Sequence, residues 1–252
     1  MKYTHFRIIV FILVLLISSN LLTAQVVDTI NADKKINILK INVPALFFKN
    51  ISLQYETKLG RKNSFAIAVR YRPKSNMPFQ STVEKLIDQP SVRVDLFKMG
   101  NFSITPEYRF YLGKKAAPLG FYIGPFISYN HYNADVPVNY MGDTKTGVFV
   151  GGFNTFTAGF QLGAQWKLSE KIYLDWWIAG PNYGISKGDF VCNTPLNEVE
   201  QISMDFELFR IMEGSNPRLI DSYKVDANGA SFVLDGPWGG IRAMGINIGY
   251  RF

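Results

Sequence analysis

The chain has 252 residues, of which 27 are basic and 20 are acidic, and it is rich in aromatic residues, with 20 Phe and 13 Tyr. The basic residues are scattered and form no Lys/Arg cluster with interleaved aromatic residues, which excludes nucleic acid as an expected partner. A mean hydropathy near zero together with many aromatic residues is typical of strands with polar alternate positions, and the length suits one large all-β domain.

The first 24 residues are predicted to be a secretory signal peptide. Lys2 and Arg7 precede an uninterrupted apolar run over residues 8–17, and small residues precede a cleavage site after Ala24. This run is shorter than the about 20 apolar residues of a membrane-spanning helix, and no later stretch approaches that length. Because two of the 27 basic residues lie in the leader, the expected mature domain, residues 25–252, carries a net charge of +5.

Eight segments alternate apolar and polar residues with the period of two that is typical of strands with two different faces. In chain order, these predicted strands cover residues 36–43, 51–59, 64–71, 102–111, 121–129, 152–167, 172–179 and 239–252. Pro106 and Pro125 fall inside predicted strands, where each removes a hydrogen-bond donor, so local bulges are expected there.

Short and long connections alternate between these strands. Short turns lie at residues 60–63, 112–119 and 168–171, and long segments cover residues 72–101, 131–150 and 182–238. A capping-box pattern, Ser81 followed by Glu84, predicts a short helix that ends before Pro90. This alternation predicts an eight-stranded antiparallel up-and-down transmembrane β-barrel with long external loops.

Residues 194–213 of the last long segment have two interpretations. Thr194-Pro195 is typical of a helix start, and it is followed by apolar residues at helical spacing. These residues are Val199, Ile202, Phe206 and Phe209. Apolar residues also alternate over 202–208, so a pair of strands projecting above the barrel is the alternative.

The two faces of the predicted strands decide between a membrane barrel and a soluble one. The polar faces are rich in Gly, Ser, Thr, Ala and Gln, which suits a crowded lumen better than a water-facing surface. The apolar faces carry no charge, and aromatic residues gather near both strand ends, as in the two girdles of a membrane barrel. A soluble sandwich with an aromatic core is the alternative.

The hairpin ITPEYRFYLGKKAAPLGFYIGPFISY and the terminus NIGYRF resemble small OmpA/OmpX-like outer-membrane barrels, and among these an uncharacterised family of domains of unknown function. The resemblance covers residues 35–252 and implies an integral protein of the Gram-negative outer membrane, in contact with lipid and lipopolysaccharide. It also implies assembly by the barrel-assembly machinery, with Tyr250 and Phe252 as part of the assembly signal. It implies no activity.

Charged residues on the polar faces predict a plug in the periplasmic half of the lumen. These residues are Glu56, Lys58, Glu107, Arg109, Lys167, Asp175 and Arg251, with Lys40 as a possible further cation. An eight-stranded barrel is just wide enough for side chains to fill. Because an unpaired buried charge costs far more than a paired one, we expect ion pairs across the lumen. The alternative is that these groups are wetted strand ends.

No catalytic residue, cofactor or metal site is expected. His131, the only histidine of the mature chain, has Ser128 and Asp135 as its nearest partners for nucleophilic catalysis. However, Ser128 and His131 fall on opposite faces if their strand continues. The acids of the last connection are predicted to form a solvated face, with calcium binding as the alternative. They are Glu198, Glu200, Asp205, Glu207 and Glu213.

The sequence thus favours a non-enzymatic outer-membrane barrel with a structural or surface-interaction role, for which an external protein or glycan is the candidate ligand of its loops. A narrow, porin-like channel and a lipid-modifying enzyme are the alternatives, and the content of the lumen separates them.

Overall fold

The computed structural model describes residues 36–76, 91–214, 219–243 and 245–252. These residues belong to one compact unit, Asp33–Phe252. The predicted signal peptide and the predicted helix between Ser81 and Pro90 lie outside the described residues.

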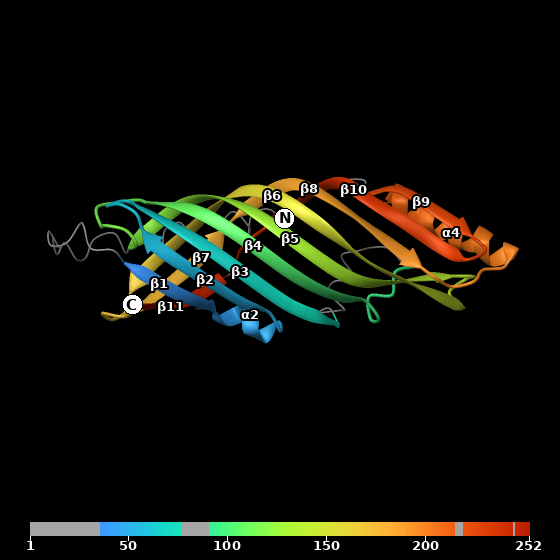
Figure 1. Ribbon diagram of the computed structural model, residues 1–252, viewed down its shortest axis with the longest axis horizontal. Helices are drawn as coiled ribbons and strands as arrows, with labels where there is room; N and C mark the ends of the chain where they lie inside the picture. The colour runs from blue at the N-terminus through green and yellow to red at the C-terminus, as the bar shows by residue number, and fades with distance from the viewer. Residues whose placement is uncertain (1–35, 77–90, 215–218, 244) are drawn as a thin grey trace, which may run out of the picture. The chain divides into compact units, whose positions relative to one another are not determined.

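The described residues form one antiparallel sheet of eleven strands with two helices (Figure 1). In chain order the elements are β1 (Asn37–Asn42), α2 (Val43–Phe47), β2 (Ile51–Lys58), β3 (Asn63–Asn76), β4 (Lys98–Tyr111), β5 (Gly120–Tyr140), β6 (Lys145–Lys167), β7 (Ile172–Ala179), β8 (Pro181–Cys192), α4 (Glu198–Gly214), β9 (Ile220–Asp226), β10 (Gly229–Ile241) and β11 (Gly245–Arg251). Neither helix is long and apolar enough to cross a membrane.

The sheet closes into an eight-stranded up-and-down barrel, as predicted. Strands β1 to β6 pair in sequence order, β7 and β8 both pair with β6, and β11 pairs with β7 and with β1. Because only Gly180 separates β7 from β8, and only three residues separate β10 from β11, each couple forms one long wall strand. Pairing of β1 with β11 closes the sheet, so no strand edge is open at the level of this pair.

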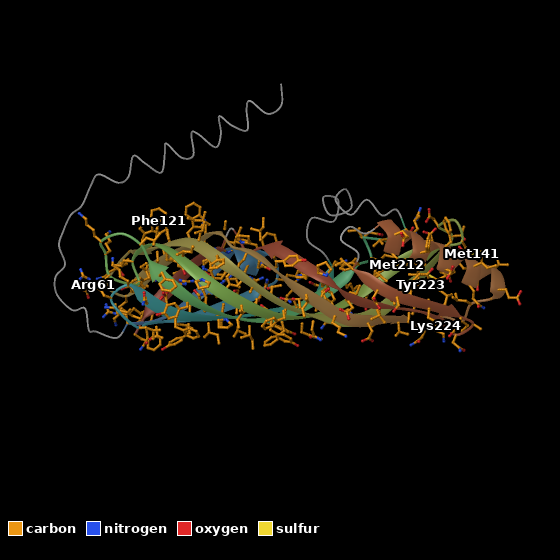
Figure 2. The ribbon with its side chains drawn as sticks, turned by 90° about the horizontal axis from the view of Figure 1, so that it is seen from above. Arg61, Phe121, Met141, Met212, Tyr223 and Lys224 are labelled. Atoms are coloured by element: carbon orange, nitrogen blue, oxygen red, sulfur yellow. The ribbon has the colours of Figure 1, made fainter. Side chains whose placement is uncertain are left out.

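Alternation along each strand sends polar residues into the barrel and apolar residues outward. On β2, Gln54 and Glu56 are buried in the lumen, whereas Leu53 and Tyr55 on the opposite face are exposed. Figure 2 shows the same outward direction for Phe121 of β5. The barrel therefore has the reverse of the usual distribution in a water-soluble protein, in which apolar residues fill the interior.

The two prolines inside the wall do not produce the predicted bulges. Pro106 keeps its pairing with β3, and Pro125 keeps its pairing with β6. On the seam between β4 and β5, pairing is missing at both prolines, but one register continues through Glu107 and Phe126, which lie between them. The seam therefore loses hydrogen bonds without gaining an extra residue.

Two long connections contain more regular structure than predicted. Residues 131–150, predicted to be a loop, continue β5 and β6 as one long hairpin, and the described part of residues 182–238 contains β8, β9 and most of β10 besides the helix α4. We call residues 131–154 and the described part of 187–235 the extension, because they lie beyond the level at which β2 ends at Ile51.

The extension has an apolar core of its own. Along β5, the inward Ser128 and Asn130 of the barrel are followed by Ala134 and Val138, which are buried against apolar neighbours. The core combines residues of β5, β6, β8, α4, β9 and β10 with one residue, Leu196, of the segment between β8 and α4: Ala134, Val138, Tyr140, Phe149, Phe153, Phe190, Cys192, Leu196, Met204, Leu208, Met212, Ile220, Ala230 and Phe232. The same strands thus line a polar lumen at one end and an apolar core at the other.

Residues 198–214 form a helix, α4, rather than a pair of strands. Its start is a reciprocal cap: the Asn197 side chain accepts from the Glu200 N–H at 3.0 Å, and the Glu200 carboxylate accepts from the Asn197 N–H at 2.8 Å. Glu200 also binds Lys145 of β6, and these hydrogen bonds lower the pKa of its carboxyl below the usual value. Glu200 is buried, contrary to its predicted place on a solvated face.

The buried face of α4 differs from the predicted one. Met204, Leu208 and Met212, spaced four residues apart, pack into the core of the extension. The predicted apolar stripe of Val199, Ile202, Phe206 and Phe209 is exposed. The predicted stripe is wrong because Glu200, paired with Lys145, occupies a position on the packed face that its charge would ordinarily exclude.

We expect Met204→Ala to loosen the extension. Gly147 lies against both Met204 and Cys192, since a Cβ there would come within 2.9 Å of Met204 Cε and 3.1 Å of Cys192 Sγ. Truncating a buried Met costs about 2–5 kcal/mol, which should raise local opening and accelerate labelling of the Cys192 thiol about tenfold or more. Maleimide labelling kinetics of the folded protein measure this rate.

The matched control is Ile202→Ala on the exposed side of α4, for which the labelling rate should equal that of wild type. Equal rates for Met204→Ala and Ile202→Ala would show that α4 does not cover Cys192.

Candidate functional site

Four charged residues meet in the lumen of the barrel. They are Lys40 of β1, Glu56 of β2, Arg109 of β4 and Asp175 of β7. Each lies on the inward face of its strand and is at most 1% exposed. Charges buried this deeply require partners, because desolvation of an ion costs several kcal/mol.

Asp175 receives three hydrogen bonds. Its Oδ2 accepts from Lys40 Nζ at 2.5 Å and from Arg109 Nη1 at 2.8 Å. Its Oδ1 accepts from the Tyr122 hydroxyl at 2.9 Å. Both cations and a neutral donor from a fourth strand therefore stabilise this one carboxylate.

Glu56 is surrounded in the same way. Its Oε2 lies 2.5 Å from Lys40 Nζ and 3.4 Å from Arg109 Nη1. Its Oε1 accepts from the Tyr111 hydroxyl at 2.7 Å and from the Ser64 hydroxyl. Lys40 thus bridges the two carboxylates.

Two glutamines and a ring complete the environment of the cations. Gln165 Oε1 accepts from Lys40 at 2.8 Å, and Gln54 Oε1 accepts from Arg109 Nη2 at 3.1 Å. The Arg109 guanidinium also lies 4.3 Å from the centre of the Tyr122 ring, a favourable cation–π distance. Gly163 is required beside this ring, since a Cβ there would lie 2.3 Å from the Tyr122 hydroxyl.

A second ion pair extends the cluster along the lumen. Glu107 Oε1 accepts from Arg109 Nε at 2.8 Å, and Glu107 Oε2 accepts from Arg242 Nη1 at 2.9 Å. The Arg242 guanidinium stacks on Trp177, 3.8 Å from the ring centre. We call these residues the lumen cluster: Lys40, Glu56, Glu107, Arg109, Asp175 and Arg242. It contains three carboxylates and three cations and is therefore neutral.

The lumen cluster includes some of the predicted charges and not others. Glu56, Glu107, Arg109 and Asp175 come together, with Lys40 as the further cation. Three predicted cations lie elsewhere: Lys58 is buried two positions further along β2, Lys167 is exposed at the end of β6, and Arg251 is half-buried at the end of β11. These three are closer to strand ends than the cluster, and the long side chains of Lys167 and Arg251 reach water there.

Sequence reasoning missed Arg242. Alternation counted back from Ile246 places residue 242 on the apolar face, but the break between β10 and β11 changes the phase. There the Arg242 N–H donates to the Gly180 carbonyl at 2.8 Å, opposite the break between β7 and β8. The run Gly239-Gly240 and the glycine at 180 were the available signals that alternation is interrupted.

The structure does not assemble the candidate catalytic residues. Ser128 is buried in the lumen, with its hydroxyl 2.8 Å from that of Thr105. His131 is exposed on the other face and lies 2.9 Å from Asn154 Oδ1, and Asp135 pairs with Lys74. Within the part of the chain that the structure describes, no three His, Cys, Asp or Glu residues form a group that could hold a metal ion.

We expect Arg109→Met to lower the free energy of unfolding by about 3–5 kcal/mol, because it leaves buried carboxylates without a partner. Lys167→Met removes a cation that is exposed, and should change this free energy by less than about 0.5 kcal/mol. Urea titration of both variants, folded in the same detergent, measures the difference. Equal losses would mean that the lumen cluster does not stabilise the barrel.

Comparison with known proteins gives a family. Residues 9–204, more than half of the chain, match the family described as "Protein of unknown function (DUF3575)". No curated protein and no solved structure matches the chain. The predicted membership of an uncharacterised family is confirmed, whereas the likeness to OmpA and OmpX stays a prediction. The chain therefore belongs to the DUF3575 family of proteins of unknown function.

Proposed function

We propose that this protein is an integral outer-membrane β-barrel without catalytic activity, closed to solutes by the lumen cluster, which presents the extension for interactions at the cell surface. The observation that carries the proposal is the reversed polarity of the barrel. Large apolar side chains stay exposed around its outer face, including Leu39, Leu53, Val69, Phe102, Ile127, Phe160, Trp176, Ile185 and Ile248.

These exposed residues come from every wall strand and form a belt. Soluble monomers rarely expose contiguous apolar patches larger than a few hundred Å². A bilayer explains both the belt and the closure between β1 and β11, because backbone groups in hydrocarbon must be paired and this closure leaves no edge at that level. The two properties occur together here.

The extension has a different outer surface. Ion pairs with exposed partners lie on it or at its border, such as Lys187–Asp235 at 3.1 Å and Lys224–Asp226 at 2.7 Å. In Figure 2, Tyr223 and Lys224 lie at this end, with Met141 and Met212, and Arg61 lies at the opposite end of the barrel. Exposed ion pairs are typical of a surface in water, which supports exposure of the extension outside the bilayer, although the same surface carries the exposed apolar stripe of α4.

The lumen cluster favours a closed barrel over a channel. Its side chains come from opposite parts of the wall, β1, β2, β4 and β7, and bind one another across the interior. An ion crossing this level would have to separate buried ion pairs. The arrangement of Ser128 and His131 on opposite faces gives no support to the lipid-modifying alternative.

We expect the protein to fractionate with outer membranes and to migrate as a compact, heat-modifiable form in mild detergent. Ile246→Arg should impair assembly, because Arg on the lipid face of a barrel costs about 2–4 kcal/mol at the bilayer midplane. Ile202→Arg is the matched control on the exposed side of α4 and should assemble normally. Equal assembly of both variants, or recovery of the wild type as a soluble protein, would contradict membrane insertion.

We also expect the purified protein to show no persistent open state in a planar lipid bilayer, because paired charges fill the lumen. Conductance recording at both polarities tests this. A stable open state that is insensitive to Glu107→Gln and to Arg109→Gln would show that the lumen cluster is not a plug, and would favour the porin-like alternative.

A further inference from the structure

A second feature of the lumen is a cavity of about 450 Å³ on the Arg242 side of the lumen cluster. Its lining includes two guanidinium groups, Arg70 of β3 and Arg242, and the aromatic rings of Tyr132, Trp177 and Trp238. Hydroxyl and amide side chains of the barrel make up most of the remaining polar lining. The volume suits a small organic ligand.

The charge of this cavity is not balanced. Among the described lining residues there are two arginines and no aspartate, glutamate or lysine. Arg70 makes no hydrogen bond or ion pair with another described side chain, and it lies near enough to Arg242 for the two positive charges to repel. Because Glu107 already neutralises Arg242, the uncompensated charge of the cavity is that of Arg70, and it costs free energy unless an anion lies beside it.

Hydrogen-bond donors of the cavity are also unused. Arg242 directs Nη1 to Glu107, but its Nη2 is buried without a protein partner, and so is Nε1 of Trp177. The Arg242 side chain is only 10% exposed, so it is held inside the barrel and does not lie on the surface. A guanidinium with a free N–H beside a second guanidinium is the arrangement that binds a carboxylate or phosphate through several hydrogen bonds.

The cavity lies at an open edge of the wall. Residues Gly236–Ile241 of β10 pair with β8, but β1 ends at Asn42 and the pairing of β9 with β10 ends at Leu234. No other described strand covers this edge, where α2 faces the cavity instead. Two exposed apolar residues line the cavity here, Phe48, which follows α2, and Ile241 of β10.

We propose that this cavity binds a small oxyanion, a phosphate or a carboxylate, between Arg70 and Arg242, with Trp177 as a further donor. The apolar flanks of the open edge suit an attached apolar chain. The same chemistry is offered by a soluble phosphate and by the phosphate head group of a lipid. Binding in this cavity adds a ligand to the closed barrel and leaves the ion pairs of the lumen cluster in place.

The test uses the full chain folded in a zwitterionic detergent, in a buffer free of phosphate and sulfate. Isothermal titration calorimetry is carried out with inorganic phosphate and, separately, with dihexanoyl phosphatidic acid, with dihexanoyl phosphatidylcholine as the lipid control. Arg70→Gln removes a cation that has no described carboxylate partner. Arg61→Gln makes the same change of charge in an exposed turn (Figure 2).

We expect at least one phosphate probe to bind, with a Kd at least tenfold weaker in Arg70→Gln and within twofold of wild type in Arg61→Gln. Without ligand, Arg70→Gln should unfold at the same temperature as wild type or higher, because it removes the repulsion from Arg242. Arg242→Lys keeps a cation for Glu107 but lacks Nη2, and should also weaken binding, so the test does not depend on one variant.

The pattern of binding identifies the source of the oxyanion. Binding of inorganic phosphate supports a soluble ligand, and binding of phosphatidic acid alone supports a lipid head group. Absence of binding by both probes, or equal binding by wild type and Arg70→Gln, would overturn the proposal. Fractionation of the protein with membranes is unaffected by either result, so failure here is distinguishable from failure of the outer-membrane proposal.

Discussion

The neutral ion cluster in the lumen is the interaction on which the rest of the barrel depends. Burying a single Lys or Asp is prohibitively costly, yet Lys40 and Asp175 are both fully enclosed, because each satisfies the other. The hydroxyls of Tyr111 and Tyr122 and the amide of Gln165 complete the hydrogen bonding. Ion pairs and amides fill the interior of the barrel, and apolar residues lie on its outer face. A hydrogen-bonded polar network is therefore what makes this polarity of the two faces stable.

One set of strands meets three environments. The outer face of β6 near Phe160 belongs to the apolar belt, its inner face at Gln165 binds the ion cluster, and its far end at Phe149 enters the core of the extension. Each environment requires different side chains, although the pairing of the strand is continuous through all three. Period-two alternation satisfies the first two together, and a change in the inward residues from polar to apolar satisfies the third.

The barrel was predictable from the sequence because alternation is a strong local signal. The eight strands and the inward direction of Glu56, Glu107 and Asp175 follow from period two, and the strand order follows from the alternation of short and long connections. The rest depends on tertiary contacts: the inward position of Arg242 results from a break opposite Gly180, and the buried face of α4 includes Glu200 because Lys145 of a distant strand neutralises it. Residues 131–150 show weak alternation, which predicts a loop, because residues 137–140 are buried on both faces in the hairpin that β5 and β6 form there.

The wall is closed by pairing between its first and last strands, β1 and β11. Ile38 pairs with Arg251, and the Phe252 N–H donates to the Asn37 carbonyl at 3.2 Å, so contacts between the two ends of the barrel sequence close the wall. The pairing of β1 with β11 joins residues at opposite ends of the barrel sequence. Forming it therefore carries a large cost in loop-closure entropy. Seven residues, Gly245–Arg251, cover two strand edges at once. A chain that lacked them would leave the facing edges of β1 and β7 unpaired and open to any other strand.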